Sequence, residues 1–172
     1  MRLSLSFFNF TKTYFMRVII INGPNLNLQI NAFTNFQIKI MNIKLITIGK
    51  TDNKNLQSLI DEYTKRLSFY VKFELEIIPD IKNVKNFSEA QQKEKEGELI
   101  LSKITPTDHL ILLDENGKTF SSVGFSEFLQ KKMNSGIKQL VLVVGGPYGF
   151  SESVYKKTVG KVSLTKMTFS HQ

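Results

Sequence analysis

The chain has 172 residues, of which 41% are apolar, and this suffices for one domain with a hydrophobic core and an appendage. It has no cysteine and only two histidines, which excludes disulfides, thiolate metal sites and cysteine nucleophiles and disfavours a zinc centre. The formal net charge of +8 suits an RNA partner, although a solvated surface of mixed charge accounts for it equally well.

The first forty residues differ in character from the rest. They contain Arg2, Lys12, Arg17 and Lys39 but no acid. Their longest apolar run is too short to cross a membrane, and polar residues interrupt the start in a way that disfavours a signal peptide. We expect residues 1–40 to be an extension outside the functional domain, which would occupy residues 41–172.

One stretch of this extension, MRVIIINGPNLNL (residues 16–28), resembles the opening strand and loop of type II 3-dehydroquinate dehydratases. In that family an arginine and a tyrosine that take part in the chemistry follow. Neither residue type occurs in the next stretch of this chain, QINAFTNFQIKI. A strand followed by Asn-Gly-Pro is also a common way to make a turn.

From Met41 onward, strand and helix patterns alternate. Residues 42–49 read as a buried strand that ends at a glycine. The next apolar residues recur at helical spacing and predict an amphipathic helix; they are Leu56, Leu59, Ile60, Tyr63 and Leu67. Residues 71–78 then alternate apolar and polar, as in a strand with one wet face.

The middle of the chain continues the alternation. Ser88 and Gln91 have the spacing of a capping box, which predicts a helix that runs through residues 93–104. A strand is expected from His109, and Asn116-Gly117 predicts a turn directly after it.

The last third predicts one more helix–strand repeat. A helix around residues 125–133 would end with Gly136 as its C′ residue. The most apolar strand, residues 139–144, leads into a short helix capped by Ser151, and a last strand begins near residue 161. The whole pattern predicts an α/β fold with a mostly parallel sheet and helices on both faces.

The loop Gly145-Gly146-Pro147-Tyr148-Gly149 follows the most apolar strand. Ligands of open α/β sheets lie beyond the carboxyl ends of strands, and glycines would let a flat ligand rest on the backbone. Glu152, at the start of the next helix, would compete with a phosphate for the same amides, which favours a ligand without phosphates. A tight strand–helix turn without a ligand remains an equal alternative.

Six motifs, collinear from Met41 to Gln172, carry a second resemblance: MNIKLITIGK, EYTKRL, KEKEGELIL, LLDENGK, VVGGPYGF and SLTKMTFSHQ. They resemble the ribosomal RNA large subunit methyltransferase H (RlmH) family of the SPOUT superfamily. The resemblance implies a C-terminal trefoil knot with S-adenosylmethionine bent inside it. The cofactor contacts that it implies fall on Leu113, Gly145, Leu164, Thr165, Lys166, Met167, Thr168 and Phe169.

The resemblance also implies what the protein does. Members of the family are homodimers that methylate N3 of a pseudouridine in helix 69 of 23S rRNA, within the assembled ribosome. By this resemblance the protein would be a cytoplasmic rRNA methyltransferase without a metal or a membrane partner. The alternatives are a ribosome-binding or RNA-binding module without catalysis and, from residues 16–28, a dehydratase.

The chain departs from the family at its end. In the family, SHQ leads into a final helix and tail with an arginine, a tyrosine and histidines near the active site, and this segment completes the knot. Because the sequence stops at Gln172, we expect a C-terminally truncated chain with an incomplete knot, and the residues present leave open whether this chain is catalytically active by itself.

Single residues near the expected site carry two interpretations each. His171 is the one candidate for proton handling, or a loop histidine that orders a helix start. Asp114 and Glu115 would orient ligand or RNA, or be solvated turn acids. Lys166 is a candidate phosphate contact, and Tyr148 or Phe150 would stack on a base or only pack. The sequence identifies no general base.

Overall fold

The structure is a computed structural model that describes residues 41–51, 53–81 and 87–164. Within these residues, strands and helices alternate along the chain. The strands are β1 (Asn42–Ile48), β2 (Phe73–Ile78), β3 (His109–Thr119), β4 (Gln139–Val144) and β5 (Gly160–Ser163). The helices are α2 (Lys54–Ser68), α3 (Glu89–Leu101), α4 (Ser122–Asn134) and α5 (Glu152–Tyr155).

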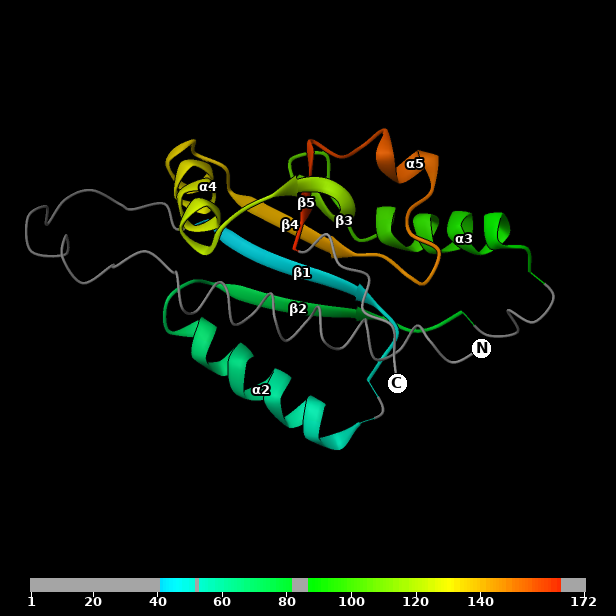
Figure 1. The fold of residues 1–172 in the computed structure, drawn as a ribbon, viewed down its shortest axis with the longest axis horizontal. Helices are drawn as coiled ribbons and strands as arrows, with labels where there is room; N and C mark the ends of the chain where they lie inside the picture. The colour runs from blue at the N-terminus through cyan, green and yellow to red at the C-terminus, as the bar shows by residue number, and fades with distance from the viewer. Residues whose placement is uncertain (1–40, 52, 82–86, 165–172) are drawn as a thin grey trace, which may run out of the picture.

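The strands form one sheet in the order β2-β1-β4-β3-β5, and every pairing between neighbouring strands is parallel (Figure 1). All five carboxyl ends therefore lie at the same edge of the sheet. The predicted α/β fold with a mostly parallel sheet is confirmed.

The helices divide between the two faces of the sheet. Parallel strands are joined by crossovers that are nearly always right-handed. Each successive crossover reverses its direction along the strand order, which places α2 and α4 on one face and α3 and α5 on the other. In agreement, α3 contacts α5, and the two lie together on the right of Figure 1, with α4 on the left.

The core lies along the central strands. The whole of β4 after its first residue is buried, as are Leu45 and Ile46 of β1 and Leu110–Leu112 of β3. Strands covered on both faces need continuous apolar runs, and this explains the composition of β4. Helix α2 buries Ile60 and Leu67, but Leu59 is 40% exposed, so the predicted apolar face is narrower than its spacing suggested.

Residues at the ends of three helices have the capping roles that are typical of their residue types. The Asn53 side chain accepts hydrogen bonds at the start of α2, and the predicted capping box of Ser88 and Gln91 begins α3. Helix α4 ends at Ser135, and Gly136 follows with a φ of +76°, which confirms it as the C′ residue. Of the helices in the described ranges, none has the length and apolarity that a membrane crossing requires.

One local prediction is confirmed in part and two are wrong. Ser151 is the N-cap residue of α5 as predicted, but its side chain makes no capping hydrogen bond and instead pairs with the Ser153 hydroxyl at 2.7 Å. Helix α3 ends at Leu101, earlier than expected. Asn116-Gly117 makes no turn, because β3 runs on to Thr119 with a register shift between Leu113 and Lys118.

Gly117, which lies in that register shift, does not serve the turn that the sequence predicted. A Cβ at Gly117 would lie 2.6 Å from the backbone nitrogen of Val162 and 2.7 Å from that of Ser163. Any side chain would therefore collide with the backbone of β5. Glycine is needed here for a close approach of two strands, and not for a hairpin turn.

Candidate active site at the carboxyl ends of three strands

Three of the residues that the family resemblance implies as cofactor contacts, Leu113, Gly145 and Leu164, lie in or directly after three neighbouring strands. Strand β3 lies between β4 and β5. Leu113 of β3 pairs with Val144 on one side and with Val162 on the other. Because Gly145 follows Val144 and Leu164 follows Ser163, the sheet brings Leu113, Gly145 and Leu164 to one edge.

The glycine loop folds as a tight turn directly beyond β4. Gly146 and Gly149 form an isolated bridge, in which the Gly149 amide donates to the Gly146 carbonyl at 3.2 Å. Gly149 has a φ of +82°, a conformation that side chains rarely adopt. The turn delivers Phe150 to the core, where its ring meets Tyr155 edge to face at 6.0 Å. The packing interpretation of Phe150 is therefore the right one.

The protein itself fills the space beside the first two glycines of this loop. A Cβ at Gly145 would lie 3.1 Å from the Phe150 ring, and a Cβ at Gly146 would lie 2.7 Å from Cδ of Glu96. The sequence suggested that both glycines leave room for a ligand. On the side where a side chain would project, they make room for Phe150 and Glu96, so a ligand would have to approach the other side of the backbone.

Glu96 is an acid buried beneath the loop. Only 3% of the residue is exposed; Oε1 accepts a hydrogen bond of 2.8 Å from Gln92, and Oε2 has no hydrogen-bond partner among the described residues. Burial raises the pKa of the Glu96 carboxyl, and the charge of Asp80 adds to this, while the Gln92 hydrogen bond opposes it. Thr47 Oγ1, which is buried in β1 beside Val144, likewise lacks a partner among these residues.

A helix glycine explains why Glu96 reaches the loop. A Cβ at Gly97 would lie 3.2 Å from Val154 Cγ2 and 3.2 Å from Ser151 Cβ. Without that Cβ, α3 packs closely against α5, and the preceding residue, Glu96, lies under Gly146. Polar atoms buried without partners are costly and need an explanation such as strain or a functional role.

A second acid ties β3 to α5. Tyr155 donates a hydrogen bond of 2.5 Å to Oδ2 of Asp114, and the Asn116 amide donates one of 2.7 Å to Oδ1. Burial raises the pKa of Tyr155, and the hydrogen bond to Asp114 raises it further, so the phenol keeps its proton. Asp114 is buried and accepts a hydrogen bond at each carboxylate oxygen, whereas Glu115 is exposed. Asp114 therefore positions the part of β3 where the register shifts and is not a solvated turn acid.

Comparison of the sequence with known proteins identifies the family of the chain. The profile described as predicted SPOUT methyltransferase matches residues 41–172. The chain is 84% identical over 132 residues to the ribosomal RNA large subunit methyltransferase H of Flavobacterium psychrophilum. The chain belongs to the RlmH family of SPOUT methyltransferases.

Other relatives agree. The enzymes of the same name from Flavobacterium johnsoniae and Parabacteroides distasonis are 83% and 64% identical to the chain over 132 residues. In all three comparisons the match covers 77% of this chain and 84% of the relative. The family resemblance seen in the sequence motifs is confirmed, and the protein is a methyltransferase by family.

Of the RlmH-type cofactor contacts expected from the sequence, three lie in the described part of the chain. Leu113, Gly145 and Leu164 are each half-buried at the carboxyl edge. Thr165, Lys166, Met167, Thr168 and Phe169 lie outside the described residues, as does His171. Residues 1–40, with the dehydratase-like stretch, also lie outside them.

The sequence interpretation of this RlmH-type protein missed Glu96 and Tyr155. An acid in a helix usually faces solvent, and only the unexplained Gly97 beside it signalled a close contact. In the described ranges, no three His, Cys, Asp or Glu side chains come together in a group that could hold a metal ion.

Proposed function

We propose that this protein transfers the methyl group of S-adenosylmethionine to N3 of a pseudouridine in helix 69 of 23S rRNA. One observation carries the proposal: in a chain of the RlmH family, the sheet brings Leu113, Gly145 and Leu164 to one edge. The relatives carry the name of a ribosomal RNA methyltransferase, which supports RNA of the large subunit as the substrate. We further propose that it acts as a cytoplasmic homodimer.

The residues at this edge suit a cofactor without phosphates. Leu113 and Leu164 supply half-buried apolar surface, and Gly145 supplies backbone without a side chain. The acid Glu152 follows the loop, where a phosphate group would meet an unfavourable charge. A ligand pocket of apolar walls with a few backbone polar groups is typical of small-molecule sites. Residues 165–169 would complete the contacts.

The chain's own contribution would be positioning and exclusion of water. The bound cofactor supplies a methyl group on a positively charged sulfur. Leu113 and Leu164 would hold it between apolar walls, and the Gly145 backbone would hold its adenine. The base must lose its N3 proton and lie in line with the methyl group, and such positioning accounts for much of the rate of a transfer of this kind.

The proposal is tested by methyl transfer. Purified chain is incubated with S-adenosylmethionine carrying a labelled methyl group and with ribosomes that lack this modification. The rRNA is then digested and examined by mass spectrometry for 3-methylpseudouridine. Label at this nucleoside in helix 69 is the expected result. Label on another nucleoside would show that the target is wrong.

Cofactor binding, measured by calorimetry, is the independent readout. Leu113→Asp places a charge in the apolar wall and should weaken cofactor binding by about tenfold or more, because burying an unpaired charge is costly. Leu99→Asp is the matched control, since Leu99 is 38% exposed on α3. If wild type binds no cofactor and transfers no label, the proposed function is wrong.

A further inference from the structure

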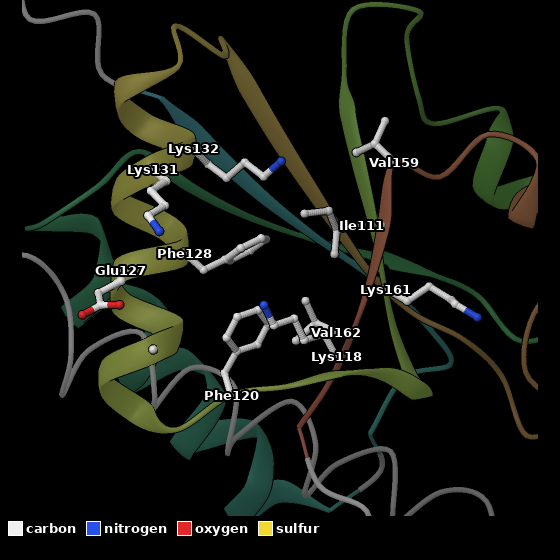
Figure 2. Close-up of a pocket in the computed structure, with 12 residues that line it drawn as sticks. Ile111, Lys118, Phe120, Glu127, Phe128, Lys131, Lys132, Val159, Lys161 and Val162 are labelled. Atoms are coloured by element: carbon white, nitrogen blue, oxygen red, sulfur yellow. The ribbon is translucent and has the colours of Figure 1, made fainter.

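An open cavity of about 500 Å³ lies between α4 and the β3–β5 edge of the sheet. Its floor is apolar, from Ile111 and Val162, and it is flanked by Phe120 and Phe128 (Figure 2). Three lysines line it on the α4 side of the sheet, and we call it the lysine groove after them: Lys118 of β3, and Lys131 and Lys132 of α4. Lys161 of β5 also borders the cavity, but Figure 2 shows its side chain directed away from it, and its ammonium lies 5.3 Å from the centre of the ring of Tyr155 in α5, on the other face of the sheet. The three lysines come from two elements and are brought together only by the fold.

The charge of the groove is one-sided. Its three lysines accompany one lining acid, Glu127, so the formal balance is three minus one, or +2. Figure 2 shows the Glu127 carboxylate directed away from the cavity. No ion pair joins any of the three lysines to an acid within the described part of the chain, whereas Lys44, Lys95 and Lys103 each have such a partner. Like charges gathered without counter-charges favour a polyanionic ligand.

Two of the three ammonium groups are held over aromatic rings. The Lys118 ammonium lies 5.1 Å from the centre of the Phe120 ring, and the Lys132 ammonium lies 5.6 Å from that of Phe128. A cation over a ring face is attracted to it, which restricts the side chain without neutralising its charge. The groove is thus partly ordered before a ligand arrives.

The groove adjoins the candidate active site. Val162 of its floor pairs with Leu113 and also with Lys118, because β3 shifts register between these two residues. Leu164 follows two residues after Val162. A strand of nucleic acid that lies in the groove would therefore pass directly beside the proposed cofactor contacts.

We propose that the lysine groove binds the phosphate backbone of the rRNA substrate and guides it past the methyl-transfer site. This inference rests on the proposed function for the identity of the RNA. Lysine acts toward phosphate as a point charge that carries no sequence information. The groove would therefore supply affinity and register, while the choice of base is left to the site itself.

Salt-dependent RNA binding tests the inference. The probe is 23S rRNA, and its affinity is measured over a range of salt concentrations for wild type, for Lys131→Gln/Lys132→Gln and for Lys118→Gln. Removal of one lysine–phosphate interaction should reduce the slope of log affinity against log salt by about 1, so the slope should be smaller by about 2 in the double variant and by about 1 in Lys118→Gln. Lys65→Gln/Lys72→Gln is the control, since these two exposed lysines lie in α2 and directly before β2, the strand at the opposite edge of the sheet.

The outcomes separate the groove from the function. Reduced RNA affinity and slope in both groove variants, with control and cofactor binding unchanged, would support the groove. RNA affinity and slope equal to wild type in both groove variants would overturn it, even if wild type methylates rRNA. A third outcome is that wild type binds RNA but transfers no methyl group, while the groove variants fail to bind RNA. This outcome would support the groove and contradict the proposed function.

Discussion

The carboxylate of Glu96 lies directly against the backbone of Gly146, so close that a Cβ at residue 146 would stand 2.7 Å from Cδ of Glu96. This contact joins α3 to the turn after β4, about which the candidate site is built. It rests on a second close approach, in which Gly97 lets α3 pack against α5. A buried acid thus supports the loop from below, although no ligand would need to touch it.

The first prediction concerns the pH dependence of stability. The folded state raises the pKa of Glu96 above its ordinary value of 4.5, mainly through burial. The folded state therefore holds the proton more tightly than the unfolded chain. The stabilising contribution of the protonated Glu96 carboxyl is fully present at pH values below the pKa that it has in the unfolded chain. This contribution is lost as the pH rises through the higher pKa that it has in the folded state.

Glu96→Gln cannot ionise and keeps an oxygen that can accept the Gln92 hydrogen bond. Relative to wild type, its free energy of unfolding should therefore improve as pH is raised from about 4 to about 8. Urea denaturation at several pH values measures this. Glu94→Gln, at an exposed position of the same helix, should follow wild type. Parallel pH curves for Glu96→Gln and wild type would show that Glu96 is not a buried acid.

The second prediction concerns the tie between β3 and α5. Tyr155→Phe removes the hydroxyl that donates to Asp114 and leaves a buried carboxylate oxygen without that partner. The cost should be about 1.5 to 3 kcal/mol in the free energy of unfolding, the range for hydrogen bonds to charged groups. Chemical denaturation measures it.

Tyr148→Phe serves as the control for this change. Tyr148 is half-buried, and its hydroxyl has no hydrogen bond to the residues that the structure describes. Its removal should change the free energy of unfolding by less than about 0.5 kcal/mol. An equal effect of the two substitutions would contradict a specific role for the Tyr155–Asp114 hydrogen bond.

The third prediction concerns the close approach of β3 and β5. Gly117→Ala would place a Cβ 2.6 Å from the Val162 nitrogen, and backbone atoms cannot move aside as a side chain does. We expect a loss of at least about 2 kcal/mol, the result of forced overpacking. Thermal unfolding measures it. Gly160→Ala is the control, because a Cβ there meets nothing within 4 Å. Similar losses for both variants would argue against the collision.

Local sequence patterns predicted the secondary structure well where neighbours along the chain decide it. The capping box at Ser88 and the C′ glycine at position 136 depend on contacts within a few residues, and both are confirmed. The turn predicted at Asn116-Gly117 is wrong because a glycine can serve either of two purposes, a positive φ or room for a close neighbour. Sequence spacing cannot distinguish these two uses, and here the neighbour is the backbone of β5.

The sequence by itself determined the alternation of strands and helices, and hence a parallel sheet whose carboxyl ends share one edge. Its motifs also identified the family. Only the tertiary structure decided that β3 lies between β4 and β5, that Glu96 is buried and that lysines 118, 131 and 132 gather in one groove. Periodicity records which face of an element is apolar. Strand order and helix packing instead arise from contacts between residues far apart in the chain, which no local pattern encodes.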